Sequence, residues 1–480
     1  MSLHLRPYQD DIYAEARQLL KSGKRTLLIQ SPTGSGKTVL VAHMLANATL
    51  KGYRAWFCVH RRELVKQSVL TLGESAGLPV GIVAAGFPGN RHELIQVCSV
   101  QTLARRRHLL PDPQLIVWDE CHHVAALSWG AIHSAYPNAV HVGLTATPER
   151  LDGTGLSGWF EELVTGPSVA NLIKEGWLSP YRLFAPGGPD LSAVHSVAGD
   201  YNKKELALAM AKSSVTGDAL SHYQKYAMGR RAIVFMWSVE SSIEMAQKFN
   251  EAGIPAEHID GTTDDAARDA AIQGFRDGKI KILCNVEIIS EGFDLPAIEA
   301  AFLLRPTRSL ALYLQQVGRA LRPSPGKDEA LIFDHAGNCR LHGLPDDERE
   351  WTLEGRVKSK KKADGCPVKQ CPKCYAMLPA AAAACKWCEW KFAAQAREIE
   401  QVEGELAEVD LEQQRHARKQ EQAKARGLDD LIRLAKLRGY KNPAKWAEHV
   451  WRARQAKQAA RDAEIYARNA ADSGRLPVGW

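Results

Sequence analysis

The segment "QLIVWDECHHV" (residues 114–124) places two carboxylates, a thiol and two imidazoles in five consecutive positions. All of these groups bind metals, so a zinc site is one interpretation. Adjacent residues on a strand point to opposite faces, however, so consecutive ligands do not converge easily on one small ion. The apolar run before them, residues 115–118, is typical of a strand buried on both faces. A buried strand that ends in Asp119 and Glu120 favours phosphate chemistry instead.

A second stretch supplies the loop that phosphate chemistry needs. "RTLLIQSPTGSGKTVLVAHML" (residues 25–45) runs from an apolar strand, through a loop with two glycines, into a helical pattern. Backbone N–H groups of such a loop hold phosphate oxygens at a helix N-terminus. Ser31 stands where the general pattern has its first glycine, but strand, loop and helix agree. The predicted ligands are ATP and Mg²⁺, with contacts expected from Thr33, Gly34, Ser35, Gly36, Lys37 and Thr38. Among these, Lys37 is expected to reach the β and γ phosphates and Thr38 to ligate Mg²⁺.

The carboxylates after the buried strand then take on definite roles. Asp119 is expected to hold Mg²⁺, and Glu120 to orient and deprotonate the water that attacks the γ phosphate. With Asp-Glu-Cys-His at residues 119–122, the chain resembles the Superfamily 2 helicases, whose second motif is often Asp-Glu-x-His. The resemblance implies that His122 couples hydrolysis to movement, together with Thr145 and Thr147 of "LTATP".

Other motifs of that family follow in order along the chain. "LRPYQ" (residues 5–9) is similar to the adenine-reading element, and "VHRRELVKQ" and "SVQTLARR" resemble elements that grip the nucleic-acid backbone. "SEGFDLP" resembles the element that senses nucleotide and strand. Each segment alone fits a solvated helix or a turn, so their order is what carries the prediction. The residues implied are Arg6 and Gln9 for adenine, Arg61, Arg62, Gln101 and Thr102 for nucleic acid, and Gly292 and Asp294 for sensing.

A second parallel α/β pattern starts near residue 231, without a phosphate loop of its own. In the family, a second domain closes on the ATP that the first one holds. "YLQQVGRALRP" (residues 313–323) looks like the arginine-bearing motif of that domain. The i,i+3 spacing of Arg319 and Arg322 puts both guanidinium groups on one helix face, from which they could stabilise the charge of phosphoryl transfer. Gln315 is the candidate contact to the nucleotide or to the attacking water.

Five of the ten cysteines lie between residues 366 and 388, which favours metal over disulfides. "CPKCYAMLPAAAAACKWC" predicts a four-cysteine zinc ribbon with the ligands Cys371, Cys374, Cys385 and Cys388. Cys366 could substitute for one of them or remain free. Such a site has no open position for catalysis. The ribbon is expected either to bind nucleic acid through Lys369, Lys373, Lys386, Trp387 and Trp390, to be a structural staple, or to dock a protein.

Charge, hydropathy and motif order together predict the localisation of the protein and its division into domains. The formal charge of +7 permits a polyanionic partner. No apolar stretch approaches the roughly 18 residues of a membrane span and no signal peptide is recognisable, so a cytoplasmic protein without membrane contact is expected. The predicted fold is α/β: RecA-like parallel-sheet domains at residues 1–168 and 169–345, a basic linker at 346–365, the zinc ribbon at 366–391 and a helical, partly basic tail at 392–480.

These motifs predict an ATP-dependent helicase or translocase. "LTATPERLDGTGL", then "SVANLIKEGWLSP" and the cysteine cluster, resemble the bacterial RadD group and related phage-encoded helicases. That resemblance implies DNA rather than RNA, a role in repair, recombination or phage replication, and a replication or repair protein as partner. The alternatives are a translocase that never unwinds, and a zinc-dependent recruitment factor whose ATPase switches affinity. A type III restriction subunit is disfavoured, because no nuclease-like carboxylate and lysine arrangement follows residue 345.

Overall fold

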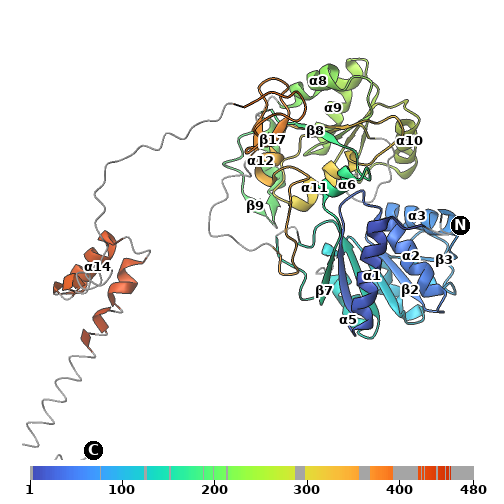
Figure 1. The fold of residues 1–480 in the computed structure, drawn as a ribbon, viewed down its shortest axis with the longest axis horizontal. Helices are drawn as coiled ribbons and strands as arrows, with labels where there is room; N and C mark the ends of the chain where they lie inside the picture. The colour runs from blue at the N-terminus through green and yellow to red at the C-terminus, as the bar shows by residue number, and fades with distance from the viewer. Residues whose placement is uncertain are drawn as a thin grey trace, which may run out of the picture. The chain divides into compact units, whose positions relative to one another are not determined.

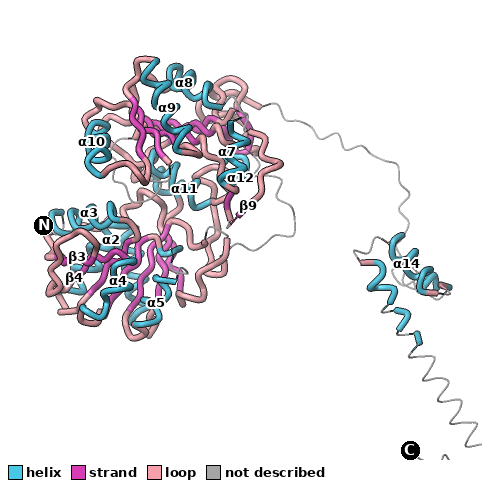
Figure 2. Tube along the Cα trace, turned by 180° about the vertical axis from the view of Figure 1, so that it is seen from behind, coloured by secondary structure: helices cyan, strands magenta, loops and turns pink. Residues whose placement is uncertain are grey.

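The computed structural model describes residues 4–75, 77–123, 127–150, 153–186, 189–197, 199–211, 215–286, 298–355 and 368–392, together with most residues from 420 to 455. The chain divides into two compact units, Met1–Ala394 and Gln395–Trp480. The first unit contains two parallel sheets, each flanked by helices (Figures 1 and 2). Gly292, Asp294 and Cys366, which the sequence singled out, lie outside the described residues.

The first lobe is built on a seven-stranded parallel sheet in the order β3-β4-β2-β5-β6-β1-β7. Its strands are β1 (Thr26–Gln30), β2 (Ala55–Val59), β3 (Val80–Val83), β4 (Ile95–Ser99), β5 (Leu115–Asp119), β6 (Val140–Thr145) and β7 (Glu162–Thr165). Its helices are α1 (Pro7–Lys21), α2 (Lys37–Thr49), α3 (Arg62–Leu70), α4 (Val100–Arg106) and α5 (Leu127–Ala135), with short turns η1 (Thr71–Ser75), η2 (Arg107–Leu109) and η3 (Cys121–His123).

Both faces of this sheet are covered, which explains its continuous apolar strands. Leu27 and Ile29 pack with residues of α1 and α2, whereas Leu28 between them packs on the opposite face with Trp118 and residues of α5. The indole of Trp118 stacks on Trp129 at 5.4 Å between ring centroids. Because successive side chains of a strand point to opposite faces, each apolar strand packs against a helical layer on both sides.

The second lobe repeats the design with a six-stranded parallel sheet, β12-β13-β11-β14-β15-β8. Its strands are β8 (Tyr181–Phe184), β11 (Ala232–Phe235), β12 (Ala256–Ile259), β13 (Ile282–Asn285), β14 (Ala300–Leu303) and β15 (Ala330–Asp334). Its helices are α6 (Val169–Lys174), α7 (Lys203–Ala211), α8 (Val215–Tyr226), α9 (Val239–Glu251), α10 (Asp265–Arg276), α11 (Leu310–Ala320) and α12 (Asn338–His342). A hairpin of β9 (Ser196–Val197) and β10 (Asp200–Tyr201) precedes α7. The predicted pair of RecA-like parallel sheets is confirmed.

The cysteine ribbon, residues 368–392, is attached to the second lobe. Its strands β16 (Val368–Gln370) and β17 (Met377–Pro379) pair antiparallel. Ala376 bridges to Phe184 at the edge strand β8, and Figure 1 shows β17 beside β8. Met377 is buried in the core of the first unit and Ala376 packs with the aromatic cluster around Phe333. The ribbon therefore covers a sheet edge that would otherwise be open.

The second unit is described only in part. Helix α14 (Leu428–Leu437) follows an extended Gly427 and buries Leu431 and Ala435 on one side. Acidic residues stand in its first turn and Lys436 in its last, as the helix dipole favours. The predicted helical tail is confirmed for the described residues of this unit.

Candidate active site

The phosphate loop follows β1 and enters α2 at Lys37. Gly34 and Gly36 have φ of 88° and 79°, in the left-handed region that favours glycine. Ser31 and Ser35 bond through their hydroxyls at 2.7 Å, which gives Ser31 a role within the loop. The ammonium of Lys37 donates to the carbonyl of Ser31 at 3.1 Å, so it lies over the loop. The backbone therefore has the shape that holds phosphate oxygens.

Side chains at the start of helix α1 donate hydrogen bonds to this loop. The Tyr8 hydroxyl and the Gln9 amide donate to the Ser35 carbonyl at 2.5 and 3.1 Å, and Gln9 also donates to the Gly36 carbonyl at 3.1 Å. The Gln9 side-chain oxygen accepts from the backbone N–H of Arg6 at 3.0 Å. Gln9 is thus bound to main chain at both ends of its amide, and its reading of adenine stays a prediction.

Trp177, which the sequence analysis did not select, lies beside these contacts. The guanidinium of Arg6 lies 4.5 Å from the ring centre of Trp177, and Tyr8 packs edge-on against the same indole. Trp177 is 169 residues from Tyr8 in the numbering of the chain. No local sequence pattern predicts the contact between Tyr8 and Trp177, which only the fold brings together.

Asp119 and Glu120 lie at the carboxyl end of β5, on the same sheet edge as the phosphate loop. Burial and the neighbouring Glu120 raise the pKa of Asp119 to about 6, while Lys37 and His60 oppose that rise. Glu120 has a φ of 49°, a left-handed conformation that costs free energy in a non-glycine residue. A buried carboxyl with a raised pKa, near an ammonium and next to a residue with a strained backbone, is consistent with the predicted Mg²⁺ and water chemistry.

A path of close polar contacts leads from Glu120 to the segment after β6. The His122 imidazole Nδ1 lies 3.4 Å from a Glu120 carboxylate oxygen and 3.3 Å from the Thr145 hydroxyl. The Thr145 hydroxyl donates to the Thr147 carbonyl at 2.8 Å, and the Thr145 carbonyl accepts from Ser31 N–H at 2.9 Å. The predicted coupling residues therefore connect the carboxylate to the phosphate loop.

The zinc interpretation of "DECHH" finds no support in this geometry. Cys121 is fully buried in the apolar core, where burial raises the pKa of its thiol well above the usual value. His122, the next residue, faces the carboxylates. The side chain of His123 lies outside the described part of the chain. Consecutive residues diverge, as the spacing argument expected.

Helix α11 of the second lobe packs directly on the phosphate loop. A Cβ atom placed on Gly318 would lie 2.5 Å from Cβ of Thr33, and one on Gly34 would lie 3.5 Å from Cγ of Arg322. Gln315 is 3% exposed, and its buried amide nitrogen has no hydrogen-bond partner among the described residues. Arg319 is 5% exposed in the same helix, whereas Arg322 follows the end of the helix at Ala320, so the prediction that both arginines lie on one helix face is wrong. The structure therefore brings the predicted arginine motif to the predicted ATP loop.

The predicted nucleic-acid contacts separate into two places. A cavity of about 370 Å³ in the first lobe is lined by His60, Arg62, Ala84, Ala85, Ser99, Gln101, Thr102, Arg105 and Arg106. Within it, Gln101 donates to the His60 carbonyl at 3.2 Å. Arg61 instead lines a second cavity together with residues of the second lobe. Arg62 also forms an ion pair with Asp265 of α10 at 2.9 Å.

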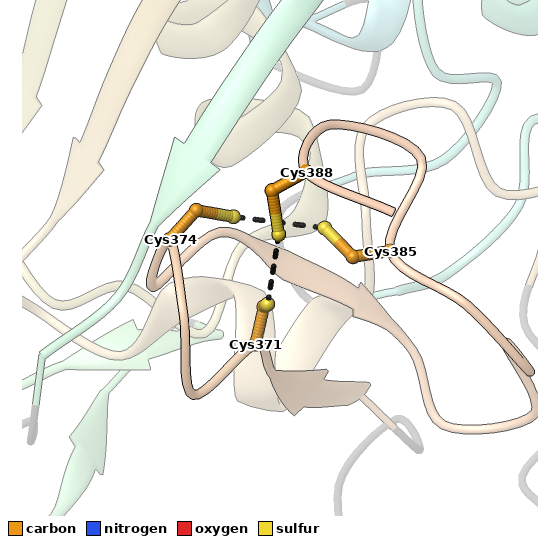
Figure 3. A group of neighbouring side chains, drawn as sticks. All are labelled: Cys371, Cys374, Cys385 and Cys388. Carbon is orange, nitrogen blue, oxygen red and sulfur yellow. Dashed lines mark hydrogen bonds between the residues drawn. The ribbon is translucent and has the colours of Figure 1, made fainter. Parts of the chain in front are cut away.

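The four predicted zinc ligands converge, as Figure 3 shows. Their sulfur atoms all lie within 4.8 Å of one another, with Cys371 and Cys388 at 3.5 Å and Cys374 and Cys385 at 3.6 Å. The two Cys-x-x-Cys turns end alike: Tyr375 and Glu389 have φ of 61° and 59°. Four thiolates at such distances fit the tetrahedral shell of Zn²⁺.

Most of the ribbon residues proposed to bind nucleic acid are engaged internally. The Lys369 ammonium donates to the Ala382 carbonyl at 2.6 Å, and Lys386 lies over the rings of Tyr181 and Trp387. Trp387 packs partly buried against the second lobe. Lys373, Lys386 and Trp390 are exposed. The contacts of Lys369 and Trp387 fit the structural staple, and the three exposed side chains stay candidates for binding.

The geometry defines a two-lobed ATP hydrolase, and comparisons with known proteins agree. Residues 2–150 match the family described as the res subunit of type III restriction enzymes, and residues 214–324 match the helicase conserved C-terminal domain. The chain is 37% identical over 388 residues to a 51.5 kDa protein of Lactococcus phage isolate 7-9, covering 80% of this chain and 82% of the relative. The chain belongs to the Superfamily 2 helicases and is an ATP-hydrolysing enzyme.

Two further similarities are more distant. A protein of Schizosaccharomyces pombe, named as a candidate mitochondrial ATP-dependent helicase irc3, is 31% identical over 73% of this chain, which spans only 61% of that relative. A fragment of an HsdR subunit of a type I restriction enzyme from Vibrio vulnificus superposes with a TM-score of 0.56 at 22% identity, over 71% of this chain and 67% of that one. The latter shows the fold alone. Within the described residues, no helix is long and apolar enough to cross a membrane.

Proposed function

We propose that this protein is a DNA-stimulated helicase or translocase whose ATP site forms between the two lobes. The observation that carries the proposal is the contact of Gly318 of α11, and of Arg322 just after that helix, with Thr33 and Gly34 of the phosphate loop. A site assembled from two lobes can couple hydrolysis to their relative movement. Two cavities with cationic linings, one of them lined by both lobes, supply a track for a polyanion.

Each site residue then has a role in the cycle. Backbone N–H groups of the loop and Lys37 hold the phosphates, while Thr38 and Asp119 hold Mg²⁺. Glu120 takes the proton of the attacking water, and His122 holds that carboxylate in place. Arg319 and Arg322 stabilise charge at the γ phosphate when the lobes close. Gln315 supplies its buried amide nitrogen, which has no hydrogen-bond partner among the described residues, to the nucleotide or to the water.

The choice of DNA rests on resemblance. One relative, at 23% identity, is named a DNA 3'-5' translocase, XPB2 of Sulfurisphaera tokodaii. The RadD resemblance points the same way and adds repair, recombination or phage replication as the setting, with a protein of that machinery as partner. The ribbon cysteines hold Zn²⁺ in this proposal and stabilise the edge of the second lobe, because Ala376 bridges to β8. We place the protein in the cytoplasm.

The test is ATP hydrolysis measured without nucleic acid and with single-stranded DNA, duplex DNA and RNA. Glu120→Gln serves as the blank, because it keeps the shape of the side chain and removes the base. Stimulation by DNA that the blank lacks supports the proposal. Equal stimulation by RNA would contradict the choice of DNA, and hydrolysis that no polymer alters would contradict the motor itself. A strand-displacement assay then separates unwinding from translocation.

A further inference from the structure

A cavity of about 550 Å³ lies at the carboxyl edge of the second sheet. Residues that follow four neighbouring strands line it: Trp237 after β11, Asp260 after β12, Val286 after β13 and Arg305 after β14. The carboxyl edge of a parallel sheet is where α/β proteins bind ligands. The cavity also contains Arg61 of the first lobe, so it lies on the path proposed for nucleic acid.

The charges of this cavity suit a polyanion. Four cations line it, namely Arg61, Lys203, Lys204 and Arg305, of which Arg305 is ion-paired with Asp200 at 3.4 Å. Its two carboxylates already have donors. Asp260 accepts from the backbone N–H groups of Thr262 and Thr263, each at 2.8 Å. Asp200 accepts from the Thr307 hydroxyl at 3.0 Å and the Arg308 N–H at 2.7 Å. Phosphates entering the cavity therefore meet cations and few unoccupied acceptors.

The cavity is also lined by an aromatic side chain, that of Trp237. Trp237 is half-buried, with part of its indole packed against the second-lobe core while it also lines the cavity. The residues on either side of it are fixed: Met236 N–H donates to the Asn285 carbonyl at 2.9 Å, and Ser238 caps α9. The ring is therefore held in position. A held aromatic face between cations is the arrangement on which unpaired bases stack.

We propose that Trp237 stacks on an unpaired base of a single strand whose phosphates lie among the four cations. This inference rests on the proposed function and deepens it, because it makes single-stranded nucleic acid the track. A base inside a duplex has its faces covered by its neighbours, so a ring recessed in the second lobe reaches only an unstacked base. Stacking is indifferent to base identity, so the contact adds affinity without sequence preference.

The experiment compares a fluorescein-labelled oligothymidylate with an abasic oligonucleotide of equal length, by anisotropy at several salt concentrations. Trp237→Ala is expected to weaken thymidylate binding by roughly 5- to 100-fold and to leave abasic binding unchanged. The slope of log K against log salt is expected to stay the same, because no phosphate contact is lost. Trp237→Phe should keep most of the affinity, and Tyr53→Ala, an exposed aromatic of the first lobe, should match the wild type.

Equal losses for the two oligonucleotides, a changed salt slope, or no loss at all would overturn the inference. Trp237→Leu guards against a folding defect, since it keeps apolar volume without an aromatic face and should weaken thymidylate binding as the alanine variant does. The proposed function is judged separately by ATP hydrolysis of the wild type. If DNA stimulates hydrolysis but the Trp237 variants bind both oligonucleotides like the wild type, only this inference fails.

Discussion

Gly318→Ala is the substitution whose effect follows most directly from the structure. The added methyl group would lie 2.5 Å from Cβ and 2.8 Å from Cγ2 of Thr33. Carbon atoms in contact prefer about 3.5–4.0 Å, so α11 and the phosphate loop must separate by about 1 Å. Within an α-helix, alanine is otherwise more stable than glycine by roughly 0.5–1 kcal/mol. The variant should therefore fold at least as well as the wild type.

Gly318→Ala is expected to lower the rate of ATP hydrolysis. A displacement of about 1 Å of catalytic groups lowers turnover by about 10²-fold. We expect Gly318→Ala to lose about that factor in DNA-stimulated ATP hydrolysis. Binding of ATP should change little, since the loop and its helix belong to the first lobe. Steady-state kinetics, equilibrium nucleotide binding and the thermal midpoint measure the three quantities separately.

The matched control is Gly158→Ala, where a new Cβ meets nothing within 4 Å and φ is not positive. It should hydrolyse ATP like the wild type. Turnover of Gly318→Ala within about twofold of the wild type would refute the contact between α11 and the loop. A lowered thermal midpoint would refute the claim that the loss is catalytic.

Three further predictions follow from other contacts. Asp265→Ala should raise DNA affinity up to about fivefold at low salt by releasing Arg62 from an exposed ion pair worth at most about 1 kcal/mol. Asp119→Asn should abolish hydrolysis yet raise the thermal midpoint of the metal-free protein at pH 7.5. The pKa of this carboxyl is about 6 in the folded protein and near 3.8 in the unfolded chain. Its ionisation therefore destabilises the fold increasingly as the pH rises from 3.8 to 6, and fully above pH 6. Cys385→Ser should lose zinc in metal analysis and lower the thermal midpoint, because the ribbon covers β8.

Each of these has its own contrary result. The gain of Asp265→Ala must vanish at high salt, and a gain that persists there would contradict the ion-pair explanation. The stability gain of Asp119→Asn must disappear near pH 4, and a gain equal at both pH values would contradict the buried carboxylate. Lys373→Ala, an exposed ribbon residue, is the control for Cys385→Ser. Full zinc content in Cys385→Ser would contradict the four-cysteine site.

Sequence patterns foretold the parts that depend on neighbours along the chain. Continuous apolar runs of four or five residues, such as β2 and the part of β5 before Asp119, are typical of strands buried on both faces, so the sheets were predictable. The spacing of Cys371, Cys374, Cys385 and Cys388 predicted their convergence. Both depend on local periodicity, which a single sequence displays.

Contacts between distant segments left no such signal. Arg62 is a candidate phosphate contact by motif, and only the fold reveals its ion pair with Asp265, 203 residues away. Gln9 looks the same in sequence whether its amide reads a base or braces the phosphate loop. The ribbon joins the second lobe through a backbone bridge at Ala376, which no side-chain pattern encodes.

The central claim is that one ATP site is built from both lobes, and Arg322→Ala tests it most directly. Its side chain belongs to the second lobe and lies beside Gly34 of the first. Single-turnover hydrolysis with saturating ATP and single-stranded DNA should fall by about 10³-fold or more, as when an arginine finger is removed, while ATP still binds. Hydrolysis at the wild-type rate would contradict a composite site and leave the first lobe as the whole enzyme.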